Sequence, residues 1–426
     1  MPYNNIAEVA IIGSGPSGFA ASYTLSKAGV PHLLFDKDVF PRDKICGDGL
    51  SPKVLGCIYR LDPKILDDMA NDESKFTKIN VGIAVAPNFK ELVMPINPQP
   101  YNQNIPAGFV SKRIVFDDFL VKRLTDKNTQ FVHGANVTEL TRTDAGIEIK
   151  YTQNGEQKVA FAKAIIGADG DRSIVKKTFA PHKMDHAHYC AGLRAYYKGV
   201  KGMHPKGALE LHFLNKSLPG YFWVFPLPNG DANVGIGMIS SYVSKNKVNL
   251  REVMLEAIKN EPHLKDRFAD ATLDGKIMGW GLPLGSKLWQ MSGDRFVLTG
   301  DAASLIDPIS GEGIGNALNT GRYAADAILE ARKNGDLYSA ADMKKHFDAR
   351  IKRTMGIELK MSSFFQKAAY YPRLLTVIIS IVRSNDRLVA FLADLYNGKE
   401  FHKKIMNPIL IFKILCGFLP SFSSKK

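Results

Sequence analysis

Cysteine is scarce in this sequence of 426 residues, with four in all, at Cys46, Cys57, Cys190 and Cys416. No two of them have C-x-x-C spacing, which argues against a structural metal site or a disulfide framework. The sequence therefore predicts no metal, and a reducing cytoplasm is the default compartment for such a chain. The first apolar run, within MPYNNIAEVAIIG, has no basic segment before it, so no signal peptide is expected.

The sequence also lacks a recognisable nucleic-acid-binding module, and this limits the partners that its charge can serve. The formal net charge is +14, and such a basic surplus can serve nucleic acid, an anionic membrane surface or anionic ligands. The lysines are scattered and no nucleic-acid-binding module is recognisable, so nucleic acid is not an expected partner. No internal repeat or low-complexity linker divides the chain. Its length predicts two or three subdomains, and its composition, with 45% hydrophobic and 23% charged residues, is that of a globular protein.

The chain opens with signals for a β-α-β unit. Residues 7–12, AEVAII, form a short apolar run that stops at a glycine, as a buried parallel strand does. Residues 17–28 predict a helix, and HLLFD at 32–36 predicts a second strand that ends in an acid. Between strand and helix lies GSGPSG at 13–18, a G-x-G-x-x-G motif.

This motif predicts a dinucleotide site because of its context between a strand and a helix. Gly13 would allow the tight turn, Gly15 would let the backbone approach a pyrophosphate, and Gly18 would let the helix pack on the strand. The helix N-terminus offers free N–H groups to phosphates. Asp36, 23 residues after Gly13, would accept hydrogen bonds from the adenosine ribose.

Two later segments separate a flavin from a nicotinamide cofactor. IIGADGDRS (165–173) predicts a strand that ends at Asp169, and VLTGDAASLIDPISGEGIGNAL (297–318) predicts a strand, then Asp301, then Gly311 and Gly313 at the start of a helix. An aspartate at a strand end can hold a ribityl hydroxyl, and a glycine-rich helix start can direct N–H groups at the flavin N1/O2 edge. The cofactor expected from these segments is FAD.

Together the three segments resemble the FAD-dependent hydroxylase superfamily typified by p-hydroxybenzoate hydroxylase. Within it, FPRDKICGDGLSP (40–52) resembles the PRxKxCGxGLSP loop of the geranylgeranyl reductase family. LPGYFWVFP (218–226) resembles that family's P-x-x-Y-x-W-x-F-P signature, although Pro219 lies one position later than the pattern asks. Flavin halogenases carry W-x-W-x-I-P in its place, which this sequence does not show.

The resemblance implies an α/β fold in which a Rossmann-type FAD-binding domain is interleaved with an antiparallel-sheet substrate domain, followed by C-terminal helices. The expected FAD-binding segments are residues 1–75, 105–185 and 280–333. The substrate domain would take residues 76–104 and 186–279, and residues 334–426 would be helical.

The resemblance also assigns roles to individual residues. Val137 would meet the adenine through its backbone, and Asp169 would lie near the pyrophosphate, a position associated with NADPH handling as well. The remaining positions expected to contact FAD are Ser17, Asp36, Cys46, Gly47, Gly49, Arg113, Asp301, Gly313 and Ile314. Strand alternation places Tyr221, Trp223 and Phe225 on one face and Phe222 and Val224 on the other. Tyr221 and Trp223 are expected to line the substrate cavity, whereas Phe225 is expected in the core.

The activity that the resemblance implies is saturation of C=C bonds in a prenyl or other lipid-like substrate, by hydride transfer from the reduced flavin N5. Cys46 is a candidate for a chemical role beside the flavin, and its alternative role is that of a small residue fitting a crowded loop. Two other functions remain open: an FAD-dependent monooxygenase or halogenase acting on an aromatic substrate, and a non-catalytic electron-transfer flavoprotein. No second glycine-rich nucleotide site is present, so the electron donor would be transiently bound NAD(P)H or a reduced carrier.

The last apolar stretch, NPILIFKILCGFLPSF (407–422), contains Lys413 and Pro420 and is too short to span a bilayer comfortably. Flanking lysines favour a basic amphipathic helix that lies on a membrane surface. The sequence thus predicts a cytoplasmic protein with peripheral contact at the inner face of the membrane. The alternative is a terminal helix packed on the core.

Overall fold

The computed structural model describes residues 6–96, 105–125, 127–333, 335 and 338–396. Its first layer is an eight-stranded sheet in which strand β11 pairs in parallel with β1, and β1 with β2. The path β17-β18-β11-β1-β2-β8 carries the antiparallel strands β9 and β10 beside it. The bounds are β1 Ile6–Ile12, β2 His32–Asp36, β8 Thr129–His133, β9 Ala135–Thr143, β10 Gly146–Gln153, β11 Glu156–Gly167, β17 Ser292–Gly293 and β18 Phe296–Leu298.

Strands β9, β10 and β11 form a β-meander, and its last strand has a second role. β11 pairs antiparallel with β10 through its first half and in parallel with β1 and β18 through its second. The second half is buried on both faces, as a central parallel strand is. The meander therefore delivers Gly167 to the same sheet edge as Ile12.

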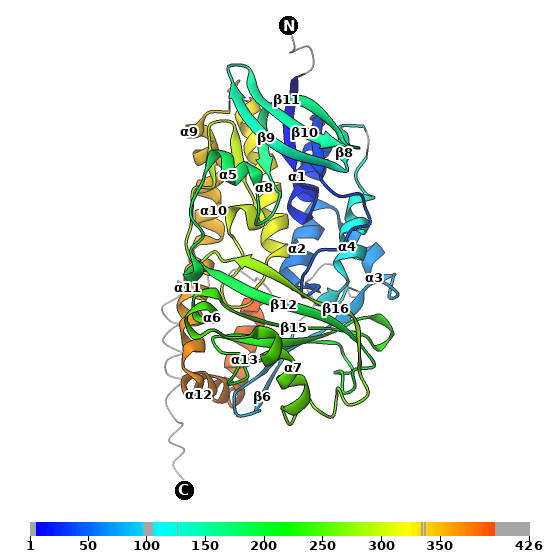
Figure 1. The fold of residues 1–426 in the computed structure, drawn as a ribbon, viewed down its shortest axis with the longest axis vertical. Coiled ribbons are helices and arrows are strands. Elements are labelled where there is room, and N and C mark those ends of the chain that lie inside the picture. The colour runs from blue at the N-terminus through cyan, green and yellow to red at the C-terminus, as the bar shows by residue number, and fades with distance from the viewer. Residues whose placement is uncertain (1–5, 97–104, 126, 334, 336–337, 397–426) are drawn as a thin grey trace.

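Two helices, α1 (Pro16–Lys27) and α8 (Ile314–Lys333), lie side by side against this sheet (Figure 1). Their close approach depends on glycine, since a Cβ at Gly321 would lie 2.0 Å from the carbonyl oxygen of Ser17. Both helices thus begin at the same edge of the sheet. Helices α2 Pro52–Leu61, α3 Pro63–Ala70, α4 Arg113–Val121 and α5 Ile174–Phe179 lie on the same half of the molecule.

A second, seven-stranded sheet lies beyond these helices, in the order β16-β12-β15-β14-β13-β5-β6 (Figure 1). Helices α6 (Ser240–Asn246) and α7 (Leu250–Asn260) contact it, and Met254 of α7 shares a core cluster with Phe222 and Val224. The strands are β5 Val81–Val85, β6 Glu91–Pro95, β12 Tyr189–Lys198, β13 Ala208–His212, β14 Gly220–Pro226, β15 Ala232–Ile239 and β16 Thr272–Pro283.

The expected α/β fold with a mixed first sheet and a largely antiparallel second sheet is confirmed, while the residue boundaries of the two domains stay a prediction. The stretch 40–52 contains a two-residue strand, β3 (Gly49–Leu50), in a small sheet with β7 (Gly108–Val110) and β4 (Thr77–Ile79). Helix α4 follows β7 in the chain and ends at Val121.

The chain from residue 338 to 396 is mainly helical, as expected. The segments are α9 Ala340–Met343, α10 Ala349–Thr354, α11 Gly356–Gln366, α12 Pro372–Arg383 and α13 Asp386–Tyr396. No helix within the described ranges is long and apolar enough to cross a membrane. The apolar stretch 407–422 lies outside the described residues.

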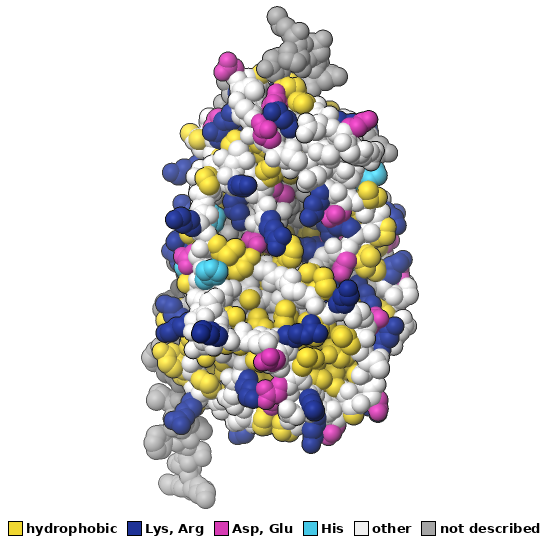
Figure 2. Space-filling view, viewed as in Figure 1, with side chains coloured by type: hydrophobic (Ala, Val, Ile, Leu, Met, Phe, Trp, Pro, Cys, Tyr) yellow, Lys and Arg dark blue, Asp and Glu magenta, His cyan; other side chains and the backbone are white. Residues whose placement is uncertain are grey.

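Basic side chains are distributed over the visible face rather than gathered into one patch (Figure 2). This distribution agrees with the scatter of lysines along the sequence and does not resemble the continuous basic stripe of a nucleic-acid-binding surface.

Candidate functional site: a cofactor cradle between two sheets

The glycines of the loop 13–18 have two different roles. A Cβ at Gly13 would lie 2.4 Å from the Ala168 carbonyl oxygen, and one at Gly18 would lie 1.8 Å from the Gly13 carbonyl oxygen. At Gly15 the nearest atom to such a Cβ is 3.7 Å away, at the Nη2 of Arg42. Gly13 and Gly18 therefore permit close backbone packing, whereas Gly15 leaves room beside the start of α1.

The start of α1 is suited to an anion. Gly15 is the N-cap residue, and no side chain accepts a hydrogen bond from the first turn of the helix. Unpaired N–H groups at a helix start attract phosphates. Ser17, expected at the cofactor, directs its hydroxyl inward and donates a 2.6 Å hydrogen bond to the Oγ1 of Thr299. Only its backbone is then free to face a ligand.

Asp36 ends β2 directly beside the glycine loop. Its Oδ2 accepts hydrogen bonds from the Ser14 backbone N–H at 2.9 Å and from the Ser14 hydroxyl at 2.6 Å. The Asp38 backbone N–H donates to its Oδ1 at 3.0 Å. The carboxylate is therefore held in place at the end of the second parallel strand, where a Rossmann-type fold reads the ribose.

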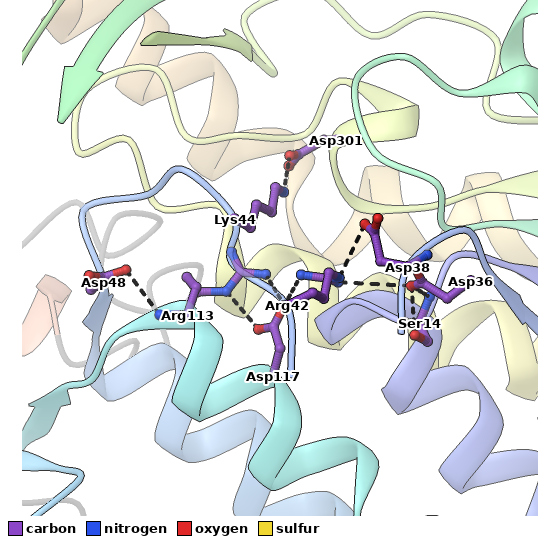
Figure 3. A network of polar contacts seen from close by, with 9 residues as sticks. All are labelled: Ser14, Asp36, Asp38, Arg42, Lys44, Asp48, Arg113, Asp117 and Asp301. Atoms are coloured by element: carbon purple, nitrogen blue, oxygen red, sulfur yellow. Dashed lines mark hydrogen bonds and ion pairs between the residues drawn. The ribbon is translucent and has the colours of Figure 1, made fainter. Parts of the chain in front are cut away.

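A network of charges joins this region to α4 (Figure 3). Arg42 contacts three carboxylates, with Nη1 2.8 Å from Asp117 Oδ2, Nη2 3.9 Å from Asp36 Oδ2 and Nε 3.9 Å from Asp38 Oδ2. Arg113, which was expected at the cofactor, is fully buried and donates to Asp117 through Nε at 2.6 Å and Nη2 at 2.7 Å. Burial acts to raise the pKa of Asp117, but the Arg113 and Arg42 guanidinium groups outweigh it and keep that pKa below its usual value.

Arg42 and Asp117 were missed by sequence reasoning. The signals that could have found them are the arginine of the FPRDK stretch and the spacing of Asp117 four residues after Arg113 on a predicted helix. Lys44, from the same loop, donates to Asp301 Oδ2 at 3.0 Å. The loop therefore links the ribose-side strand to the third cofactor segment, where Asp301 lies beside Gly313.

Asp48 is a further residue that the sequence did not single out. It is fully buried and adopts a left-handed backbone conformation with φ of 64°. Its Oδ2 accepts hydrogen bonds from Tyr196 and from Asn233, each at 2.8 Å. The Asn233 amide also donates to the Cys46 carbonyl oxygen at 2.9 Å. Asp48 thereby holds the Cys46–Gly49 turn against the second sheet.

The aromatic strand β14 contacts both glycine-rich segments expected at the flavin. The Trp223 indole donates to Asn233 at 2.9 Å and lies within 3.5 Å of a Cβ placed on Gly47. The Tyr221 hydroxyl donates to the Ser310 carbonyl oxygen at 2.7 Å, beside Gly311. Phe225, expected in the core, is half-buried and packs against Gly47 as well as a small apolar cluster. Phe222 and Val224 lie in the core on the opposite face, so the predicted alternation is confirmed.

Cys46 lies between these groups. Burial raises the pKa of its thiol, against the lowering effect of the Arg113 guanidinium that interacts with it. The thiol is therefore protonated at neutral pH. This protonation state makes Cys46 a proton holder rather than a nucleophilic thiolate.

The remaining positions expected at the cofactor lie around the cradle, the region between the start of α1, Asp36, Asp301 and the Cys46–Gly49 turn. Asp169 accepts a hydrogen bond from the Ile174 backbone N–H at 2.6 Å, while its Oδ1 is buried without a partner among the described residues. Val137 lies on β9, the strand that follows β8, opposite Tyr151. Ile314 begins α8 and is buried. The structure thus brings Gly15, Asp36, Asp301 and the Cys46–Gly49 turn around one region, with Val137 on the more distant meander.

The buried Asp48 carboxyl predicts a pH dependence of stability. Burial raises its pKa from 3.8 to about 6, although hydrogen bonds from Asn233 and Tyr196 act to lower it. The folded state then binds a proton that the unfolded state releases, so stability decreases as the pH rises through this interval. Relative to Asp48→Asn, the cofactor-free wild-type protein should lose up to about 3 kcal/mol in free energy of unfolding between about pH 4 and pH 7.

Urea unfolding followed across this pH range measures the effect. Asparagine tolerates the left-handed backbone at this position, so the substitution removes the titration without adding backbone strain. Tyr196→Phe serves as a control, because loss of one donor should move the wild-type transition to higher pH. Identical pH profiles for the wild-type and Asp48→Asn proteins would contradict the prediction.

The fold and the cradle together define a flavoprotein architecture of the p-hydroxybenzoate-hydroxylase type. An uncapped helix start at Gly15, an open position above it and a free buried oxygen on Asp169 fit a dinucleotide cofactor. The family model described as "FAD binding domain" matches residues 6–336. The chain belongs to this FAD-binding family.

Among curated proteins, the chain is 29% identical to the menaquinone reductase of Mycolicibacterium smegmatis, over 76% of this chain and 77% of that protein. It is also 29% identical to digeranylgeranylglycerophospholipid reductase 2 of Methanosphaera stadtmanae, over 80% and 81% of the two chains.

Two solved structures share the fold. A geranylgeranyl bacteriochlorophyll reductase-like protein from Thermoplasma acidophilum has a TM-score of 0.76 at 22% identity, covering 97% of this chain and 100% of its own. A triple mutant of a flavin-dependent brominase has a TM-score of 0.75 at 19% identity, covering 96% and 99%. At these identities the likeness is one of fold alone.

Proposed function

We propose that this protein is an FAD-dependent reductase that saturates C=C bonds of a prenyl or other lipid-like substrate. The observation that carries the proposal is the position of β14, whose Tyr221 and Trp223 lie against the glycines at 311 and 47. An isolated alkene offers no polar group to hold, so the protein must position it through apolar contact and exclude water. The names of the reductases that resemble this chain, for menaquinone and for a digeranylgeranyl lipid, support the same class of substrate.

Different residues have separate roles in the proposed reduction. When bound in its reduced form, FAD supplies a hydride to one carbon of the C=C bond. Tyr221 and Trp223 form an apolar wall, and hydrogen bonds to Ser310 and Asn233 fix the orientation of both side chains. The protonated Cys46 thiol holds a proton close to the same turn. Arg113, Asp117 and Arg42 set the position of the loop that carries Cys46.

Two parts of the proposed function, the electron donor and the membrane contact, rest on the sequence alone. The electron donor would be NAD(P)H or a reduced carrier, bound transiently. The apolar segment 407–422, which is flanked by lysines and lies outside the described residues, would contact a membrane that holds the substrate.

A monooxygenase or halogenase acting on an aromatic substrate is the second candidate, because the brominase shares the fold over nearly the whole chain. A non-catalytic electron-transfer flavoprotein is the third. Oxygen consumption that is stoichiometric with a hydroxylated or halogenated product would favour the second candidate over a reductase. Absence of any product from a protein that retains FAD would favour the third.

Mass spectrometry tests the proposal directly. The FAD-loaded protein, reduced anaerobically with dithionite, is incubated with a panel comprising geranylgeranyl diphosphate, a digeranylgeranyl ether lipid, menaquinone and a carotenoid-like polyene. We expect one lipid class to gain the mass of two hydrogen atoms per reduced bond of its prenyl chain, over and above the ring reduction that dithionite alone causes in menaquinone. A panel that is unchanged while the flavin stays reduced would count against the reductase.

The same assay examines Cys46. Cys46→Ala should retain FAD and form product at least about 100-fold more slowly, the usual contribution of a positioned proton donor. Cys57→Ala is the matched control, because Cys57 is also a protonated thiol but is buried within α2, with its thiol directed at the Gly315 carbonyl oxygen. Full turnover by Cys46→Ala would show that this residue only fits the loop.

A further inference from the structure

Helices α11 and α12 and the turn between them carry large apolar side chains that are exposed to solvent. Phe364 is 70% exposed and Tyr371 is 63% exposed. We call this surface the aromatic face, and its exposed members are Ile357, Phe364, Phe365, Tyr370, Tyr371, Leu374 and Val377. Contiguous exposed apolar surface on a globular protein marks a site of interaction.

The sequence around the aromatic face is strongly basic. Residues 349–383 contain seven lysines and arginines, namely Arg350, Lys352, Arg353, Lys360, Lys367, Arg373 and Arg383. The same segment has one acidic residue, Glu358, and Lys53 of α2 pairs with it at 2.7 Å. Arg350 is paired with Asp326 at 2.6 Å, and the other six cations leave the segment that carries the aromatic face with an excess of positive charge, which is complementary to an anionic surface.

The aromatic face is connected to the candidate active site. Gln366, at the end of α11, donates a 2.5 Å hydrogen bond to the Pro308 carbonyl oxygen. Pro308 belongs to the segment whose Ser310 holds the Tyr221 hydroxyl, and Ile309 between them is 40% exposed. Leu359 anchors the other side of α11 against Gly285. The exposed aromatics are thus adjacent to the turn that orients the aromatic strand.

We propose that the aromatic face docks on the surface of an anionic lipid bilayer. Aromatic and aliphatic side chains flanked by lysine and arginine are the pattern of helices that lie in a membrane interface. Protein interfaces are also enriched in aromatic residues and arginine, but their cores are depleted of lysine, which supplies three of the seven cations here, so a bilayer is the better match. The inference goes beyond the proposed reaction, because vesicle binding needs neither substrate nor turnover, and it assigns membrane contact to described helices in addition to the contact proposed for residues 407–422.

Flotation of the full-length FAD-loaded protein with vesicles measures the docking. The wild-type protein should bind vesicles of phosphatidylglycerol and phosphatidylcholine and bind phosphatidylcholine alone weakly. Phe364→Ser combined with Tyr371→Ser should lower the partition coefficient at least about tenfold. Lys367→Glu combined with Arg373→Glu should remove the preference for the anionic vesicles.

A matched control removes apolar surface elsewhere. Val159→Ser combined with Leu273→Ser changes side chains that are exposed on the two large sheets and should bind as the wild type does. The proposal is overturned if the wild-type protein ignores anionic vesicles, if the control loses binding equally, or if both aromatic-face variants bind normally. The last result would assign the contact to the C-terminal segment. Lipid reduction in detergent is scored separately, so a failure of docking and a failure of the reaction are distinguishable.

Discussion

Replacing Asp117 with asparagine is expected to lower the free energy of unfolding by about 3–5 kcal/mol, the usual cost of breaking a buried ion pair from one side. The Asp117 carboxylate neutralises two guanidinium groups, those of Arg113 and Arg42. Asparagine keeps the shape of the side chain but leaves the buried Arg113 without its paired carboxylate and leaves Arg42 with only the longer contacts, at 3.9 Å, to Asp36 and Asp38. Urea unfolding of the cofactor-free protein measures the change.

The next residue on the same helix gives the control. Asp118 pairs with Lys122, whose side chain is largely exposed, and exposed pairs contribute about 0.5 kcal/mol. Asp118→Asn should therefore unfold almost as the wild type does. Equal losses from the two substitutions would mean that the Arg42–Asp117–Arg113 network does not hold the loop. Asp117→Asn should also weaken FAD binding, because the loop 42–49 depends on this network for its position.

The parts of this site that the sequence could predict are those whose interacting residues lie close together along the chain. The opening strand, the glycine loop and Asp36 lie within one continuous β-α-β unit, and local periodicity and turn chemistry are sufficient to place them. The aromatic strand was predictable for the same reason, since alternation separates Trp223 from Val224.

The network around Asp48 could not be predicted in this way. Its partners Tyr196 and Asn233 are 148 and 185 residues away, and no local pattern reports such a pairing. Arg113 was assigned by resemblance, but its burial and its bidentate contact with Asp117 depend on how α4 packs. The strand Gly49–Leu50 was missed because two residues give no period, and its partner β7 is supplied by a distant segment.

A substitution in the glycine loop, residues 13–18, is also expected to have a large effect, in this case on FAD binding. Gly15→Val is expected to weaken FAD binding about 100-fold, equivalent to about 2.7 kcal/mol, while costing the cofactor-free protein about 1 kcal/mol or less. The backbone at Gly15 has φ of −63° and ψ of −174°, an extended conformation that valine adopts and that suits a residue before proline. The Cβ of the new side chain would have one neighbour within 4 Å, the flexible end of Arg42 at 3.7 Å. It therefore fits the protein and fills the space through which a pyrophosphate would approach.

Gly18→Ala separates a loss of ligand space from a loss of packing. Its Cβ would collide with the Gly13 carbonyl oxygen at 1.8 Å, and backbone cannot move aside as a side-chain tip can. This variant should lose about 3 kcal/mol or more in the cofactor-free state, with weakened FAD binding as a consequence. Fluorescence titration with FAD and urea unfolding without it distinguish the two cases. If Gly15→Val destabilised the cofactor-free protein as much as Gly18→Ala does, Gly15 would be a packing residue. Unchanged FAD affinity in Gly15→Val would place the pyrophosphate away from the start of α1.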